Sequence, residues 1–199
     1  MAAKLEFVFR TAAWLDVPEL KSKYELAVDD RISIDGVSIL DDWSWAVVRP
    51  ERNVCAIETA VKEGKIAHLS MNSSLFGEIG TYIEKTIHGF LYEVWMDTTE
   101  WVELDVDYVT EDNTSVYMRI SQKICEVFSE FADTESWVAI GVETDVEEKS
   151  SVFDTIKSAK NVVGWILRDS LVMSMFQTEY PLQKLQSHWG MMFKVSLKP

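Results

Sequence analysis

The strongest limit on the fold comes from short runs in which apolar and polar side chains alternate. In residues 4–10, Leu5, Phe7 and Phe9 fall on one side of an extended chain, and the residues between them fall on the other. Residues 101–109 alternate in the same way, with apolar side chains on one side and carboxylates on the other. A period of two predicts strands with one buried and one wet face, as in an antiparallel sheet.

Further strands are predicted where β-branched and aromatic residues gather between turn signals. They cover residues 31–34, 37–40, 43–49, 65–71, 90–96, 137–146 and 188–197. Asp35 and Gly36 predict a hairpin between the first two, because this pair readily takes the positive φ angles of a type I′ turn. The polar residues 97–99 predict a second hairpin, between residues 90–96 and 101–109.

Segments with helical periodicity separate these strands. Helices are predicted for residues 16–28, 51–64, 73–89, 113–131 and 151–167. Asp16 and Pro18 suit a helix start, and Gly64 suits a helix end. Residues 151–154 resemble a capping box. Residues 171–176 fit a helix or a strand, and residues 179–187 form a connection.

Hairpins mixed with isolated helices predict an α+β fold, with helices packed on a mainly antiparallel sheet. We expect residues 1–199 to form a single domain, and a doubly wound α/β fold is the alternative. Apolar residues make up 47% of the chain, which is enough for a sizeable core. The chain has two cysteines and no apolar segment of signal-peptide length near residue 1, so a reducing, cytoplasmic location is expected.

Negative charge is concentrated in the middle of the chain. The formal net charge is −14, and residues 93–148 contain sixteen acidic residues against two basic ones, Arg119 and Lys123. Such an excess repels nucleic acid and anionic membranes. A solvated sheet face that serves solubility is one interpretation. Because ordinary solvated faces mix both signs, the alternative is a surface that attracts a cationic partner.

No common catalytic pattern is present. The sequence lacks G-x-S-x-G, H-E-x-x-H, P-loop and G-x-G-x-x-G motifs. His68, His88 and His188 do not have the spacing of a helical metal-binding pair, so no metal site and no cofactor are predicted. The enzymatic alternative is a site assembled from residues far apart in the sequence, such as His88, Cys125 and Asp105.

The predicted partner site is an acidic surface on the strands at residues 101–109 and 137–146. Its members are Trp101, Glu103, Asp105, Asp107, Glu143, Asp145 and Glu147. The tryptophan is included because an aromatic ring surrounded by charge is typical of an interface hot spot. We therefore expect a non-enzymatic protein that binds and neutralises a basic protein, without direct contact to nucleic acid or membrane.

Two forms of this function remain open. In one, the acidic surface blocks the active site of a basic toxin such as a nuclease. In the other, it imitates duplex DNA, as an anti-restriction inhibitor does. DNA carries one charge per roughly 1.7 Å of axis, whereas carboxylates on one strand face recur about every 6.6 Å, so imitation requires several acidic elements side by side. In general character the chain is similar to the small acidic immunity proteins that bacteria keep beside secreted toxins, which implies a toxin as the partner.

Overall fold

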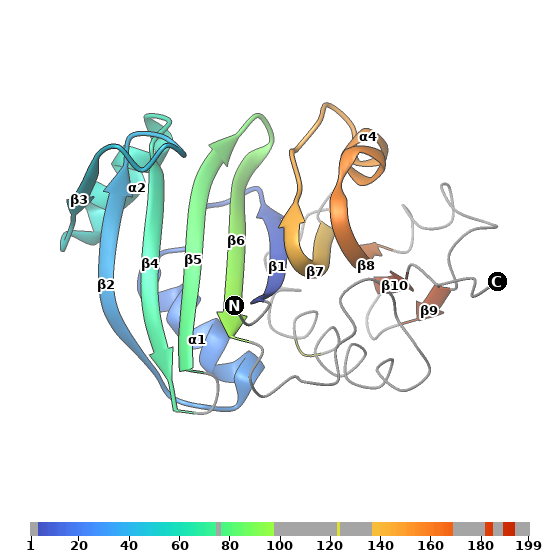
Figure 1. The fold of residues 1–199 in the computed structure, drawn as a ribbon, viewed down its shortest axis with the longest axis horizontal. Helices are drawn as coiled ribbons and strands as arrows, with labels where there is room; N and C mark the ends of the chain where they lie inside the picture. Colours follow the sequence, from blue (N-terminus) through green and yellow to red (C-terminus); the bar gives the residue numbers. More distant parts are fainter. Residues whose placement is uncertain are drawn as a thin grey trace.

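The computed structural model describes residues 4–74, 77–97, 123, 137–168, 182–184 and 189–193. In this part of the chain ten strands form one sheet in the order β3-β2-β4-β5-β6-β1-β7-β8-β10-β9 (Figure 1). The strands are β1 (Lys4–Thr11), β2 (Ile32–Leu40), β3 (Val48–Pro50), β4 (Ile66–Ser73), β5 (Gly77–Thr86), β6 (Gly89–Asp97), β7 (Trp137–Asp145), β8 (Lys160–Arg168), β9 (Leu182–Lys184) and β10 (Trp189–Phe193). The described helices are α1 (Val17–Val28), α2 (Val54–Lys62) and α4 (Val152–Ser158).

All pairings between neighbouring described strands are antiparallel. The predicted α+β class with a mainly antiparallel sheet is therefore confirmed, and the α/β alternative is not favoured. The long β1 lies in the middle of the sheet, between β6 and β7, although it is the first strand of the chain. This central position pairs residues 4–11 with residues that are 79 or more positions away in the sequence.

The predicted start of α1 at Asp16 and the predicted end of α2 at Gly64 are confirmed, whereas α2 begins at Val54 and not at residue 51. The Asp16 Oδ1 accepts a hydrogen bond from the backbone N–H of Glu19 at 2.8 Å, which satisfies one N–H of the first turn. Pro18 lies in that turn, where its missing N–H costs nothing. Gly64 follows α2 with a φ of 91°, a conformation that glycine adopts without strain.

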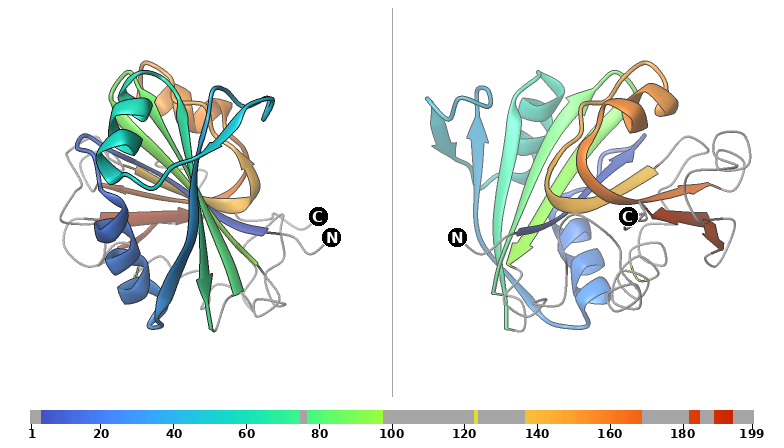
Figure 2. Two further views of the ribbon diagram at one scale, coloured as in Figure 1. Left: turned by 90° about the vertical axis from the view of Figure 1, so that its left-hand side faces the viewer. Right: turned by 45° about the vertical axis from the view of Figure 1, so that its right-hand side comes forward.

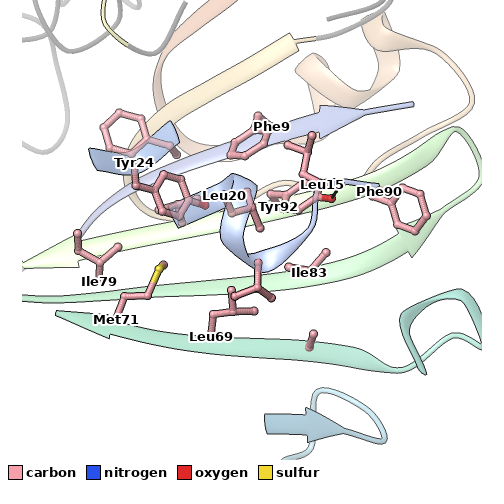
Figure 3. Packing of buried hydrophobic residues seen from close by; sticks show 14 of the residues in the cluster. Phe9, Leu15, Leu20, Tyr24, Leu69, Met71, Ile79, Ile83, Phe90 and Tyr92 are labelled. Carbon is pink, nitrogen blue, oxygen red and sulfur yellow. Dashed lines mark hydrogen bonds between the residues drawn. The ribbon is translucent and has the colours of Figure 1, made fainter. Parts of the chain in front are cut away.

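Both of these helices cover the same face of the sheet (Figure 2). Between this face and the helices lies the larger hydrophobic core, in which Leu20 of α1 and Ile57 of α2 meet Leu69, Ile83 and other strand residues (Figure 3). We call this side of the sheet the helix face. On this face the Tyr92 hydroxyl accepts a hydrogen bond from the backbone N–H of Leu15 at 2.8 Å.

The opposite side, which we call the carboxylate face, has a smaller core. There Val8, Leu91, Trp137, Ala139, Trp165 and Leu167 form a second cluster. Val152 and Ile156 of α4, with Val146 and Ala159 at its two flanks, pack against it. The residues of segment 146–159 therefore cover the end of the carboxylate face near β7 and β8.

The predicted hairpin at Asp35 and Gly36 is wrong, because β2 runs through both residues. The register against β4 shifts between Ile34 and Gly36, so Asp35 is an additional residue and forms a β-bulge. The strand predicted for residues 43–49 is also wrong for most of its length, since only Val48–Pro50 pairs with β2. Residues 41–47 instead form an irregular connection that carries two tryptophans.

The helix predicted for residues 73–89 is wrong, since β5 and the start of β6 occupy this segment. The buried positions of β5 alternate as in any strand and are occupied by Ile79, Thr81 and Ile83. Because Thr81 is polar, the alternation of apolar residues is interrupted in the sequence. Thr81 is buried because its hydroxyl lies 3.2 Å from the hydroxyl of Tyr24 on α1. Gly80 is a strand residue whose missing side chain leaves room for the indole of Trp95: a Cβ there would lie 2.1 Å from that ring.

The helix predicted for residues 151–167 is correct only in its first half. Ser151 caps α4 by accepting from the backbone N–H of Asp154 at 3.1 Å. The chain turns extended at Ala159, and the β-branched run that follows belongs to β8. Within the predicted connection at residues 179–187, Leu182–Lys184 forms β9. The predictions for residues 101–109, 113–131 and 171–176 lie outside the described residues, apart from Lys123.

Candidate functional site

The structure describes three of the seven predicted partner-site residues. Trp101, Glu103, Asp105 and Asp107 lie outside the described residues. Glu143 belongs to β7, which ends at Asp145, so Glu147 lies beyond the strand and does not continue its alternation. The Asp145 carboxylate is exposed and pairs with Lys160 at 2.9 Å, and the exposed Glu147 pairs with Lys149. Ion pairs this exposed to solvent contribute little to stability.

The structure describes only one of the three residues named for the enzymatic alternative. His88 lies exposed in the turn between β5 and β6, whereas Cys125 and Asp105 lie outside the described part of the chain. Among the described residues, no group of three His, Cys, Asp or Glu side chains is placed to hold a metal ion.

A different set of acidic and aromatic residues lies on the carboxylate face of β5, β6 and β1. Tyr82 is directly opposite Glu93, and Glu84 follows two residues along β5 on the same face. Trp95 on β6 is directly opposite Glu6 on β1. Glu84 is thus a diagonal neighbour of Glu93 across β5 and β6. Diagonal neighbours are about 7–8 Å apart between their Cα atoms, so the charge of Glu84 acts on Glu93.

Two exposed tryptophans of the connection 41–47 lie against this row. Trp43 is 46% exposed and Trp45 is 44% exposed. The rings of both meet the ring of Tyr82 edge to face, with centroid distances of 5.2 and 5.7 Å. The Trp43 indole Nε1 donates a hydrogen bond to the Glu84 Oε2 at 3.2 Å.

His68 of β4 completes the group. Its ring stacks on Tyr82 at 4.7 Å and meets Trp45 edge to face at 5.4 Å. We call these residues the aromatic–carboxylate cluster. Its members are Trp43, Trp45, His68, Tyr82, Glu84 and Glu93.

Burial and mutual repulsion perturb the two acids of the cluster. Burial, together with the charges of Glu6, Glu84 and Asp145, raises the pKa of Glu93 from 4.5 to about 7. Burial also raises the pKa of Glu84, and Glu148 adds to the effect, while the hydrogen bond from Trp43 opposes it. The pKa of Tyr82 is raised by burial and by Glu93. Neither Glu84 nor Glu93 forms an ion pair with a described residue.

The neighbouring charges on this face have polar partners within the described chain. Glu6 accepts hydrogen bonds from the backbone N–H and the hydroxyl of Thr144. Arg10 forms a buried ion pair with Glu148, in which Nη1 and Oε1 are 3.3 Å apart. The second oxygen of Glu148 is buried and has no hydrogen-bond partner among the described residues. This part of the face thus has four carboxylates and one guanidinium within the described chain.

Sequence reasoning missed the aromatic–carboxylate cluster for a definite reason. Glu84 fell in a segment predicted as helix, so its relation to Glu93 on the next strand was hidden. The alternation along the two strands could have revealed the cluster. On β5, Tyr82 and Glu84 alternate with buried residues, and on β6, Glu93 and Trp95 alternate with Tyr92 and Val94.

Comparisons with protein-family models, with curated proteins and with solved structures found no match to this chain. Within the described residues, none of the helices combines the length and the apolar character needed to cross a membrane.

Proposed function

We propose that this protein is a non-enzymatic binding protein that holds and neutralises a strongly basic protein, with a bacterial toxin such as a nuclease as the partner class. The observation that carries the proposal is the pair Glu84 and Glu93: two half-buried carboxylates beside exposed indoles, with no ion pair to a described cation. Groups whose protonation equilibria are shifted by burial and like charge gather at functional sites.

The surrounding surface has the composition of a protein interface. Trp43, Trp45, Val47 and Val48 are all exposed by 40% or more and lie within six residues of one another. Tryptophan is enriched among residues that dominate binding energy, where it is surrounded by polar groups. The carboxylates beside these side chains favour a cationic partner, because opposite charges speed encounter and fix the register of docking.

The net charge of −14 supports the same partner class on a longer range. Such a field raises the rate at which a basic protein approaches, and the effect weakens as salt shortens the Debye length from about 10 Å at 0.1 M to about 3 Å at 1 M. The predicted acidic residues Glu103, Asp105 and Asp107 contribute to this field wherever they lie.

The test is capture of the partner from native cells with the purified protein, followed by titration of the purified partner. We expect a protein with a large positive net charge, whose association rate falls steeply with salt. A matched control is Glu58→Gln, which removes a carboxylate paired with Lys62 on α2 and should leave binding unchanged. A neutral or acidic partner, or an association rate indifferent to salt, would contradict the proposal.

A further inference from the structure

The aromatic–carboxylate cluster has the chemistry of a receptor for one organic cation. We infer that it receives the guanidinium group of an arginine side chain presented by the partner. This inference rests on the proposed function and adds to it the chemical group that is bound and the residues that bind it.

The first argument is the arrangement of rings and charges. Trp43 and Trp45 meet Tyr82 at interplanar angles of 61° and 86°, so neither indole is stacked on that ring, and both indoles are partly exposed to solvent. A cation close to the face of an indole is attracted by its quadrupole. Glu84 is fixed beside these rings by the hydrogen bond from Trp43, so aromatic faces and a carboxylate lie around the same position.

The second argument comes from Glu148. Its side chain is 5% exposed, and its Oε1 already pairs with Arg10. Its Oε2 is buried without a hydrogen-bond partner among the described residues, and its charge is close enough to raise the pKa of Glu84. A buried acceptor with no donor is costly, and a positive charge that enters beside Glu84 would be attracted by the charge of Glu148 as well.

The third argument selects guanidinium over ammonium. Arg10 already shows that a guanidinium fits against a carboxylate on this face with its side chain 2% exposed. Guanidinium is planar, stacks on aromatic rings and is less strongly hydrated than ammonium, so it enters a half-buried site more readily. Its five N–H donors also reach carboxylates on two sides, as the diagonal placement of Glu84 and Glu93 requires.

A bound cation also removes an electrostatic conflict. On the same face Glu93 has Glu6 and Arg10 of β1 as neighbours, and Tyr82 and Glu84 of β5. Arg10 is already paired with Glu148, and the charge of Asp145, which pairs with Lys160 in solvent, also raises the pKa of Glu93. A positive charge beside Glu93 favours its ionised form. Binding should therefore release a proton near neutral pH and weaken as the pH falls below about 7.

The experiment uses the full-length protein and three short blocked peptides that differ at one residue: arginine, lysine or citrulline between two glycines. Citrulline has nearly the shape of arginine but carries no charge. Binding is followed by NMR of the Trp43 and Trp45 indole N–H signals. We expect the arginine peptide to shift both signals and to bind several-fold more tightly than the lysine peptide, with no binding of the citrulline peptide.

Variants separate the cluster from the general field. Glu93→Gln should weaken arginine-peptide binding by about tenfold at about pH 8 and remove its decline toward about pH 6, whereas Glu58→Gln should change neither. Trp43→Phe keeps a ring in place and should weaken binding less than Trp43→Ala. Equal binding of the arginine and citrulline peptides, or unchanged binding by Glu93→Gln, would overturn the inference.

The partner protein separates this inference from the proposed function. If Glu84→Gln with Glu93→Gln abolishes partner binding and Asp105→Lys with Asp107→Lys leaves it intact, the inference stands. If the first pair has no effect and the second abolishes binding of a basic partner, the inference fails and the proposed function survives. If the captured partner is not basic, the proposed function fails, while the peptide result still decides the chemistry of the cluster.

Discussion

The two faces of the sheet are built from the same strands but satisfy their side chains in opposite ways. On the helix face, Leu20, Leu69 and Ile83 are completely buried, and the polar atoms of Tyr92 and Thr81 are hydrogen-bonded inside the protein. On the carboxylate face, Glu84 and Glu93 are half-buried and repel one another. The helix face is packed with buried apolar side chains, whereas the carboxylate face combines a smaller core with charges that make folding less favourable.

We infer from this difference that the helix face serves mainly stability and the carboxylate face mainly binding, although both belong to one sheet. A protein that needed only solubility would leave its carboxylates fully in water, where they cost nothing. Glu93 is instead held beside Glu84 and Tyr82 at the level of the sheet, with Trp43 and Trp45 nearby and exposed. Substitutions on the two faces should therefore have effects of different kind and sign.

The largest effect is expected on the helix face. Leu69→Ala leaves a cavity beneath α1 and α2 and should lower the free energy of unfolding by about 4 kcal/mol. Trp43→Ala removes a larger but half-exposed side chain and should cost only about 1 kcal/mol. Urea unfolding of both variants measures this contrast, and equal losses would show that the two faces do not differ in this way.

The next effect concerns the packing of Trp95 across β5. A Cβ at Gly80 would lie 2.1 Å from a buried indole, so Gly80→Ala should lower the free energy of unfolding by about 2 kcal/mol. Gly36→Ala is the matched control, because nothing lies within 4 Å of a Cβ there and its φ is not positive. If thermal unfolding shifts equally for both, the indole does not lie against Gly80.

The strand β5 also shows which parts of the fold the sequence could and could not predict. Local signals predict the start of α1, the end of α2 and the strands β1, β4, β6 and β7: a capping carboxylate, a glycine stop and alternation. They do not predict β5, because its buried Thr81 is polar and Gly80 packs against a residue of another strand. Contacts of this kind depend on neighbours that a local pattern does not contain.

The candidate site shows the same limit. The charge count showed that the chain is acidic, but it did not show which carboxylates lie side by side. Glu84 and Glu93 are neighbours because β5 pairs with β6, and the helix predicted for residues 73–89 excluded that pairing. Trp43 and Trp45 were assigned to a strand, whereas they lie in a connection that folds onto Tyr82 and His68. The proposed role of the whole predicted partner site stays a prediction: Trp101, Glu103, Asp105, Asp107, Glu143, Asp145 and Glu147.

A third effect should have the opposite sign. The pKa of Glu93 in the folded protein is about 7, against 4.5 as the ordinary value. Between these values the unfolded chain loses the proton while the folded protein keeps it, so the free energy of unfolding falls as the pH rises through this window. Glu93→Gln cannot ionise and should therefore be more stable than the parent protein by about 2 kcal/mol at about pH 8.

Below about pH 4.5 the stability gain of Glu93→Gln should disappear, because the parent carboxyl is then protonated in both states. Denaturant unfolding across this pH range is the measurement, with Glu58→Gln as the control that follows the parent. A destabilised Glu93→Gln at neutral pH would mean that the carboxylate helps to hold the fold.

The smallest effect is expected at a helix end remote from the carboxylate face. Asp16→Ala removes the hydrogen bond to the backbone N–H of Glu19 and should cost about 1 kcal/mol. Binding of the arginine peptide to this variant should equal that of the parent protein. A loss of binding with Asp16→Ala, measured under conditions where the variant is folded, would indicate that the two faces are coupled.

The most direct measurement is the titration of the Glu93 side-chain carboxyl by carbon-13 NMR, in the free protein and with the arginine peptide bound. We expect a midpoint near pH 7 in the free protein and a clearly lower midpoint in the complex. A free-protein midpoint near 4.5 that the peptide does not move would contradict the claim that Glu93 is a half-buried carboxyl whose ionisation is favoured by a partner's cation.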